Sequence, residues 1–447
     1  MNNHLSDLTT GPIIRHLFKL ALPSIGASFM QMTYVITDMF WLGRMGEEAV
    51  ASVGAAGFYT WFGTSLLLTT KIGAEIGVSQ SLGRREPEQA LSFIHHNLLW
   101  ATVLSLFLSI IVLINAPHLI GFIGIPSEIV AQEGTSYLRI VALGFVFYFV
   151  NPTFAGIYMG MGNSKLPFRY LSIGVIMNLI LDPVLIFGFG PIPAMGVSGA
   201  AWATVLAQIT VWLIFFYHLI IRQEMTKLHL KKFQFDWKIS KRIFKLGLPV
   251  ALESALFSIF AMILAKMVAF YGAVAIAVQS IGSQIEAISW MTSHGFATAL
   301  GSFTGQNYGA GKRDRIKAGY KYTMMIGGIL GIIVSLLFLL FGENIFSVFL
   351  NDPESVRLGA VYLKILAVSQ IFMIFEITTR GSFNGIGKPN PPSLTGIIFT
   401  GSRIPVAAWL SAFPAIGLFG IWWAISLTSV VKGTFLPVWL MKVLREK

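Results

Sequence analysis

An acidic residue deep within an apolar segment is the first feature of this sequence that could do chemistry. Residues 17–42, LFKLALPSIGASFMQMTYVITDMFWL, are enough to cross a bilayer, and Asp38 lies well inside them. A carboxylate at that depth costs roughly 3 kcal/mol, so it rarely lacks a function. Helical spacing places Gln31, Tyr34 and Trp41 on the same stripe as Asp38. We expect this stripe to line a hydrated cavity; the alternative is an acid that reaches the membrane surface from near the helix end.

A second acidic position follows in the stretch MNLILDPVLIFGFG. Asn178 and Asp182 lie one helical turn apart on one face of this segment. Together with Asp38 they could form a carboxylate cluster, to which Thr204 could add a hydroxyl group. Two nearby carboxylates are not both ionised cheaply, so such a cluster would hold a proton or an oxygen-ligated sodium ion. The alternative is a hydrogen-bonded clamp between helices.

The C-terminal half contains a second set of polar residues within apolar segments. Its acids form a second candidate cation site: Glu253, Glu286 and Glu376. Arg380 follows Glu376 by one turn and could instead form a structural ion pair with it. Aromatic and imidazole side chains near the acid-bearing faces are candidates for a substrate cavity: Phe257, Trp290 and His294. For the histidine, a hydrogen-bonded packing role is the alternative.

The composition is that of a polytopic membrane protein. The chain has 447 residues, of which 55% are hydrophobic and 12% are charged, with a mean hydropathy of +0.72. Soluble proteins carry about 25% charged residues. The sequence therefore predicts an all-α fold with twelve transmembrane helices, roughly at residues 17–41, 50–80, 91–115, 136–159, 168–190, 196–221, 244–268, 274–305, 322–342, 358–380, 391–412 and 416–440.

The net charge of +12 is a topology signal. Lysine and arginine concentrate in alternate loops and at the two ends, which favours cytoplasmic termini in the inner membrane of a prokaryote. Nucleic-acid binding is not indicated. The chain has no cysteine, and we expect no transition-metal site and no cofactor. The expected partners are small organic substrates and the lipid bilayer, and we expect a monomer.

Three sequence matches in the same order, with nearly the same spacing between the two copies, reveal an internal repeat. FKLALP at 18–23 returns as FKLGLP at 244–249, and GVSQSLGRRE at 77–86 corresponds to FTGQNYGAGKRDR at 303–315. GIYMGMGNSKLP at 156–167 corresponds to GSFNGIGKPNPP at 381–392. The repeat predicts two lobes.

Each predicted lobe contains six spans, an even number, so both lobes have the same orientation. A pseudo-twofold axis should then run along the membrane normal, as in transporters built from parallel repeats. We expect lobes at residues 1–221 and 244–447, joined by a basic linker at 222–243 that is either an inner loop or lies on anionic lipid. Pro23 and Pro249 occupy matching positions and could kink the first helix of each lobe.

No enzyme signature is present: the sequence lacks H-E-x-x-H, a P-loop and G-x-S-x-G. ATP on this chain is therefore not the energy source, and an ion gradient that acts through the buried acids remains. A membrane-embedded enzyme would need a nucleophile beside a base, which these segments do not offer. An alternating-access carrier fits the duplicated lobes.

Four motifs together resemble the multidrug and toxic compound extrusion (MATE) transporters over nearly the whole chain. They are LALPSIGASFMQMTYVITDMFWLGRMG, NLILDPVLIFGFG, GVSGAAWAT and GQNYGAGKRD. The resemblance implies two six-helix lobes around a central cavity. It also implies export of organic, often cationic, compounds against an inward flow of protons or sodium ions.

The resemblance also implies which residues bind the coupling ion. In the DNA-damage-inducible branch the site lies in the N-terminal lobe, and its residues match Asp38, Asn178, Asp182 and Thr204. In the norfloxacin-exporter branch it lies in the C-terminal lobe and matches Glu253 and Glu376. The chain carries both sets, and we favour protons through Asp38. The alternative function is a flippase or exporter of a lipid-linked or amphipathic metabolite in the same superfamily.

Overall fold

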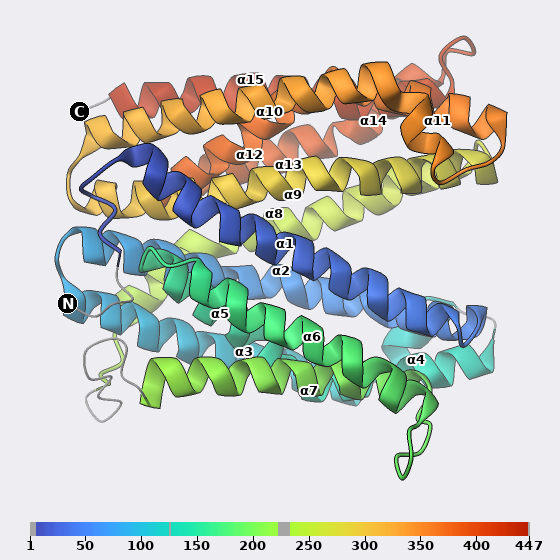
Figure 1. The fold of residues 1–447 in the computed structure, drawn as a ribbon, viewed down its shortest axis with the longest axis horizontal. Coiled ribbons are helices and arrows are strands. Elements are labelled where there is room, and N and C mark those ends of the chain that lie inside the picture. The colour runs from blue at the N-terminus through green and yellow to red at the C-terminus, as the bar shows by residue number, and fades with distance from the viewer. Residues whose placement is uncertain (1–5, 125–126, 222–232, 446–447) are drawn as a thin grey trace. The chain divides into compact units, whose positions relative to one another are not determined.

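The fold is all-α, as the sequence predicts. A computed structural model describes residues 6–124, 127–221 and 233–445 (Figure 1). Within these ranges the chain forms helices and no strand, apart from an isolated bridge between Phe189 and Ile192. The predicted linker at 222–243 falls partly on residues outside these ranges, and helix is already present from Trp237 onward.

The helices of the two halves follow each other in the same order. The first half contains α1 (Ile13–Gly43), α2 (Glu47–Gly83), α3 (Pro87–Phe122), α4 (Glu128–Leu143), α5 (Phe145–Gly160), α6 (Lys165–Phe187), α7 (Val197–Phe216) and the π-helical turn η1 (Tyr217–Ile221). The second half contains α8 (Trp237–Ala269), α9 (Ala273–Gly309), α10 (Arg313–Ser347), α11 (Pro353–Ala367), α12 (Gln370–Gly385), α13 (Asn390–Gly401), α14 (Arg403–Ser411) and α15 (Leu418–Arg445). The starts of α2 and α9 are as far apart along the chain as those of α3 and α10, so the secondary structure repeats with the sequence.

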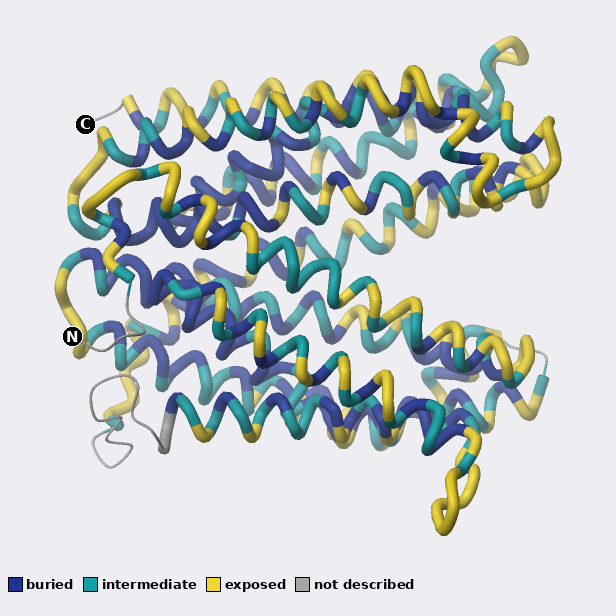
Figure 2. Tube along the Cα trace, viewed as in Figure 1, coloured by how far each residue is buried: buried dark blue, intermediate teal, exposed yellow. Residues whose placement is uncertain are grey.

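Several of these helices can cross a membrane. By length and apolarity α3, α6, α7, α8, α10 and α15 qualify singly, and the bent pairs α4–α5 and α11–α12 qualify jointly. With each bent pair, and α13 with α14, taken as one span, the helices match the twelve predicted segments in order. Large apolar side chains such as Ile329, Leu336 and Leu340 are exposed along α10, where Figure 2 shows yellow stretches. Such a surface suits contact with lipid.

Two spans are bent at equivalent places that the sequence analysis did not predict. The axes of α4 and α5 differ by 50° across Gly144, and those of α11 and α12 differ by 51°. A helix break frees backbone carbonyls, which need a donor because lipid offers none. The Ser109 hydroxyl donates to the Ala142 carbonyl at 2.7 Å, and the Ser335 hydroxyl donates to the Ala367 carbonyl at 2.7 Å. The two serines occupy equivalent positions in α3 and α10, so the repeat has duplicated this device.

Neither proline expected to kink a helix interrupts one. Pro23 lies inside α1 and Pro249 lies inside α8, and both helices are continuous across these residues. A proline removes one backbone hydrogen bond, which a long spanning helix tolerates. A bend at these two residues therefore remains a prediction.

Backbone contacts divide the chain into two compact units whose limits differ from those of the expected lobes. Unit 1 comprises Met1–Asp7 with Gly26–Ala251, and unit 2 comprises Leu8–Ile25 with Leu252–Lys447. Helix α1 therefore belongs to unit 2 up to Ile25 and to unit 1 beyond it. Helix α8 belongs to unit 1 up to Ala251 and to unit 2 beyond it.

Within each unit the same helices pack together. Helix α2 packs against α3 and α5 in unit 1, and α9 packs against α10 and α12 in unit 2 (Figure 1). Glycines permit the closest approaches: a Cβ at Gly156 would collide with the Lys71 carbonyl, and a Cβ at Gly381 would collide with the Ala297 carbonyl. Both glycines come from the repeated glycine-rich motif. That motif therefore brings α5 onto α2 and α12 onto α9.

Candidate functional site

Unit 1 contains a cavity of about 210 Å³ whose wall carries Asp38. Gln31 and Tyr34 lie on the same side of α1 and also line the cavity, as their helical spacing predicts. The opposite walls come from α2, α4, α5, α6 and α7 and mix apolar residues with polar and aromatic ones, which are Thr60, Tyr137, Phe145, Tyr148, Thr204 and Gln208. Among the lining residues Asp38 is the single charged side chain. The cavity is therefore suited to an organic molecule with a positive charge.

Trp41, the fourth member of the predicted stripe, is not among the lining residues. It lies near the C-terminal end of α1, and its ring packs edge-on against Phe187 with ring centres 6.1 Å apart. It also packs against the apolar cluster around Leu42 and Phe145. Helical spacing identified the correct face, but the cavity ends before the last turn of that face.

Asn178 and Asp182 form a buried pair on α6. The Asn178 amide donates to Asp182 Oδ1 at 3.0 Å, and the two residues are 1% and 0% exposed. Neither lines the cavity, although Asp38 and Asp182 interact electrostatically. The structure therefore places the two acids near one another, with one of them on the cavity wall.

Oxygen atoms of this cluster lack partners. Asp38 Oδ1, Asp182 Oδ2 and Asn178 Oδ1 are buried without a hydrogen bond. Neither aspartate forms an ion pair with any residue that the structure describes. Buried carboxylate oxygens without a donor are costly unless a proton or a cation occupies them. The cluster can therefore take up a small cation.

Thr204 lies on the cavity wall with a different partner from the one expected. Its hydroxyl is 2.7 Å from the Tyr34 hydroxyl, so α7 and α1 are linked beside Asp38. A hydroxyl pair of this kind can reverse its donor and acceptor roles. It can thus adjust to either charge state of the nearby acid.

The sequence analysis did not name most of the lining residues, and Tyr137, Tyr148 and Gln208 are polar examples. The two tyrosines are separated by about three helical turns, so their common face was readable from the sequence. The bend between α4 and α5 lies between them and could not be anticipated. Tyr148 is held by the Thr64 hydroxyl at 2.8 Å, and Gln208 Oε1 accepts a hydrogen bond from the Asn151 amide at 2.8 Å.

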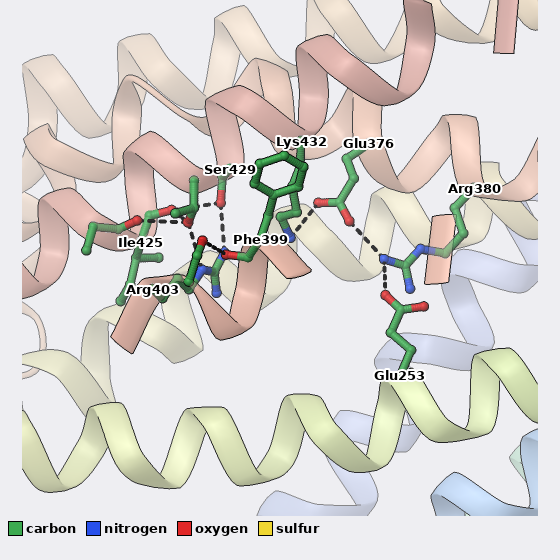
Figure 3. A network of polar contacts seen from close by, with 11 residues as sticks. Glu253, Glu376, Arg380, Phe399, Arg403, Ile425, Ser429 and Lys432 are labelled. Atoms are coloured by element: carbon green, nitrogen blue, oxygen red, sulfur yellow. Dashed lines mark hydrogen bonds and ion pairs between the residues drawn. The ribbon is translucent and has the colours of Figure 1, made fainter. Parts of the chain in front are cut away.

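In unit 2, two of the three predicted acids belong to a chain of ion pairs. Arg380 lies between Glu253 and Glu376, at 2.7 and 2.8 Å, and Lys432 contacts Glu376 at 3.0 Å (Figure 3). These residues come from α8, α12 and α15, and both glutamates are buried. The possible Glu376–Arg380 pair is therefore present, as part of a larger network. Gly396 makes room for it, because a Cβ there would collide with Glu253 Oε1.

Glu286 is outside this chain of ion pairs. It accepts a hydrogen bond from the Gln370 amide at 3.1 Å. Arg403 also has hydroxyl partners, since its guanidinium donates to Thr428 at 3.0 Å and to Ser429 at 2.9 Å (Figure 3). The three glutamates expected to form one cation site are therefore divided between two environments.

The remaining substrate-cavity candidates are exposed residues of unit 2: Phe257, Trp290 and His294. The Trp290 and His294 rings meet edge-on with centres 5.5 Å apart. None of the three lines the unit 1 cavity. Among the described residues no group of three or more histidines, cysteines or acids could hold a metal ion.

Repeated units of membrane-spanning helices, with unpaired carboxylates at a cavity, are typical of a membrane transporter. Comparison with known families agrees. The MatE family model matches residues 23–184 and 249–409, once in each half. The chain therefore belongs to the MatE family, and it is a transporter of the MATE class.

Similar proteins span the whole chain. The probable multidrug resistance protein NorM of Thermotoga maritima is 27% identical over 427 residues, covering 94% of this chain and 90% of that protein. The FAD transporter of Shewanella oneidensis is 24% identical and covers 95% and 94%. A crystal structure of a MATE transporter in complex with MaD3S has a TM-score of 0.92 at 23% identity and covers 99% of both chains. This structural likeness concerns the fold.

Proposed function

We propose that this protein is a secondary active exporter of organic cations and other organic drugs, driven by protons that enter through Asp38 and Asp182. The family and the multidrug resistance relatives support drug export. The observation that carries the proposal is the unit 1 cavity, in which Asp38 is the charged lining residue and has no ion-pair partner among the described residues.

Exchange of drug and proton follows from the cost of a bare carboxylate in an apolar site. An organic cation or a proton can neutralise Asp38, and neutralisation by one lowers the affinity for the other. Asp182 interacts electrostatically with Asp38. A proton on this pair therefore favours release of a cationic drug, and loss of the proton favours its binding.

Protons are a better match than sodium ions. In unit 2 the acids Glu253 and Glu376 are already neutralised by Arg380 and Lys432, which occupy the space a mobile cation would need. A hard metal cation takes several oxygen ligands at short distance. In unit 1 one Asp182 oxygen already accepts a hydrogen bond from Asn178, and a proton needs only one of the oxygens that remain without a donor.

A second candidate is the export of an amphipathic or lipid-linked metabolite. The FAD transporter of Shewanella oneidensis is a relative over nearly the full length, and Arg403 in unit 2 has hydroxyl partners and no acid within ion-pair distance among the described residues. The acidic unit 1 cavity disfavours a phosphate or carboxylate headgroup. For either substrate we infer a monomer in the inner membrane of a prokaryote, with both termini in the cytoplasm.

The test is transport of ethidium into proteoliposomes under an imposed pH gradient. The wild type should accumulate ethidium in response to the gradient. Asp38→Asn should reduce gradient-driven uptake to that of empty vesicles, because the amide cannot exchange a proton. Asp38→Glu should retain part of the activity.

Glu47→Gln is the matched control, since Glu47 is an exposed acid at the start of α2. It should transport as the wild type does. Normal, pH-dependent uptake by Asp38→Asn would remove Asp38 from the mechanism. Translocation of a fluorescent lipid or of FAD without ethidium uptake would favour the second candidate.

A further inference from the structure

The repeated motif that contains Gln80 and Gln306 has no part in the proposed transport chemistry, yet its side chains contact the residues that precede α1 and the first turns of α8. In unit 2, Gln306 Oε1 accepts a hydrogen bond from the Leu8 backbone N–H at 2.9 Å. The Asn307 amide donates to the Leu8 carbonyl at 3.1 Å. Both polar groups of the Leu8 backbone are thus bound by the end of α9.

Two basic residues from the same motif complete the contact. Arg315 donates to the Leu8 carbonyl at 3.2 Å, to the Thr10 carbonyl at 3.3 Å and to Asn307 Oδ1 at 3.1 Å. Lys312 donates to the Thr9 carbonyl at 2.8 Å. Gly311, with φ of 69°, provides the turn between α9 and α10 that directs these side chains toward the segment.

The segment is also buried by apolar contacts. The Leu8 side chain is 1% exposed and belongs to a cluster with Leu17, Leu20, Phe303 and Ile316. Burial of a leucine side chain typically stabilises a contact more than an exposed hydrogen bond does. Further along, a Cβ on Gly295 of α9 would contact the Ile25 backbone closely, so the first half of α1 lies directly on α9.

The equivalent contact occurs in unit 1, at the start of α8. Arg242 donates to Gln80 Oε1 at 2.7 Å and lies over the Phe93 ring at 5.6 Å. The Asp236 backbone N–H donates to His96 Nε2 at 2.8 Å. Gln80 and Gln306 are equivalent residues of the repeat, so both copies of the motif bind the start of a helix that ends in the other unit.

We propose that residues 306–315 form an anchor site for residues 8–10, which keeps the first half of α1 on unit 2 throughout the transport cycle. Asp38 lies on the same continuous helix, in the half that belongs to unit 1. If the first residues of α1 stay bound to unit 2, a conformational change must alter the later part of α1, which carries Asp38. Gln306, Asn307 and Arg315 are therefore positioning residues. The expected effect of the anchor on the rate of transport rests on the proposed function, whereas the contact itself does not.

Arg315→Ala tests the anchor, with Lys321→Ala as the control. Lys321 is an exposed lysine of α10, so the control removes the same charge from the same helix. Arg315→Ala should accelerate amide hydrogen exchange in residues 8–25 by about tenfold, as expected when charged hydrogen bonds to carbonyls are lost. It should also slow ethidium uptake without changing the Kd of the detergent-solubilised protein for ethidium. Lys321→Ala should change neither exchange nor uptake.

A reversible cross-link separates an anchor from a latch that must open. The chain has no cysteine, so Thr9→Cys with Lys312→Cys gives a single reactive pair for a short bis-methanethiosulfonate reagent. Cross-linking should not lower the uptake of this variant below its own uptake before the reagent is added. In the same variant with Arg315→Ala added, it should restore uptake, and dithiothreitol should abolish the gain.

Reversible loss of uptake on cross-linking would overturn the proposal, because the segment would then have to detach in each cycle. Faster exchange in Arg315→Ala with unchanged uptake would overturn it as well. If the wild type itself moves no ethidium, the proposed function fails. The anchor is then supported if amide exchange in Arg315→Ala is about tenfold faster and if the cross-link restores slow exchange in the cysteine variant that carries Arg315→Ala. If either result is missing, the anchor is rejected.

Discussion

At the scale of residues, the buried acids of the two halves differ in whether they form ion pairs. Asp38 and Asp182 form no ion pair with any described residue, whereas Glu253 and Glu376 form ion pairs with Arg380 and Lys432. Under the proposed function, the acids of unit 1 are the ones that exchange a cation, and those of unit 2 are held in ion pairs. The one-turn spacing of Glu376 and Arg380 was readable in the sequence, whereas the contacts of Glu253 and Lys432 with other helices were not visible there.

The ion pairs of unit 2 predict a pattern of stability. Arg380→Met should lower the free energy of unfolding of the detergent-solubilised protein by roughly 3 kcal/mol, since it leaves Glu253 buried without its cation. Adding Glu253→Gln should recover much of the loss, while Glu376 keeps Lys432. Thermal unfolding of the single and double variants measures the coupling. Additive losses would show that the Glu253–Arg380 pair contributes nothing to stability.

The buried amide of Asn178 should matter through Asp182. Asn178→Leu removes the hydrogen bond to Asp182 Oδ1 while it keeps the volume. The charged form of the acid then loses a donor, so we expect uptake of ethidium to shift its pH dependence toward higher pH. Pro183→Ala, next to Asp182 on α6, is the control for a purely structural effect. An unchanged pH profile in Asn178→Leu would separate this pair from proton coupling.

At the scale of elements, bent helices shape the cavity. The break at Gly144 separates α4 from α5, and each helix contributes a tyrosine to the wall, Tyr137 and Tyr148. The break is possible because Ser109 supplies a donor to the carbonyl that it frees. Unit 2 repeats the arrangement with Ser335, so the bends belong to the fold and not to one binding site alone.

The two serines should therefore stabilise the bends. Ser109→Ala and Ser335→Ala should each lower stability by about 1 kcal/mol, the usual value of one hydrogen bond to a buried carbonyl. Ser109→Ala should also reduce ethidium affinity, because the bend positions Tyr137 and Tyr148. Ser335→Ala is its matched control and should change stability without changing ethidium binding. Equal effects of both variants on binding would contradict this view of the cavity.

At the scale of the whole molecule, duplication has produced two units with the same helix order and different chemistry. The unit boundaries divide α1 shortly after Pro23 and α8 shortly after Pro249. The first half of α1 belongs to unit 2, and its second half carries Asp38 of unit 1. The first half of α8 belongs to unit 1, and its second half carries Glu253 of unit 2. Two continuous helices therefore pass from one unit into the other.

The proposed roles of the unit 1 and unit 2 acids predict which ion gradient drives transport. Ethidium uptake should follow an imposed pH gradient and should not respond to a sodium gradient at constant pH, because the unit 2 acids already have fixed cations. Uptake by proteoliposomes under each gradient alone measures this. Sodium-driven uptake that disappears in Glu253→Gln would show that a mobile ion competes with Arg380.

Sequence alone determined the fold class, the number and order of spans and the acid-bearing face of α1. These features depend on apolar runs and on helical periodicity, which are properties of neighbouring residues. It also identified the repeat, because matching residues keep the same spacing in both halves. Gln31, Tyr34, Asp38 and Thr204, named from the sequence, all line the unit 1 cavity.

The tertiary structure alone decided which acids have partners on other helices, where the helices bend and which unit holds the first half of α1. Arg380 reaches Glu253 from a helix distant in the sequence, and Ser109 reaches the break after Ala142 from a neighbouring helix. Such contacts depend on how helices pack, and packing is not encoded in the pattern of any single segment. The function of a buried carboxylate is set by these neighbours, since they determine whether it needs a mobile cation.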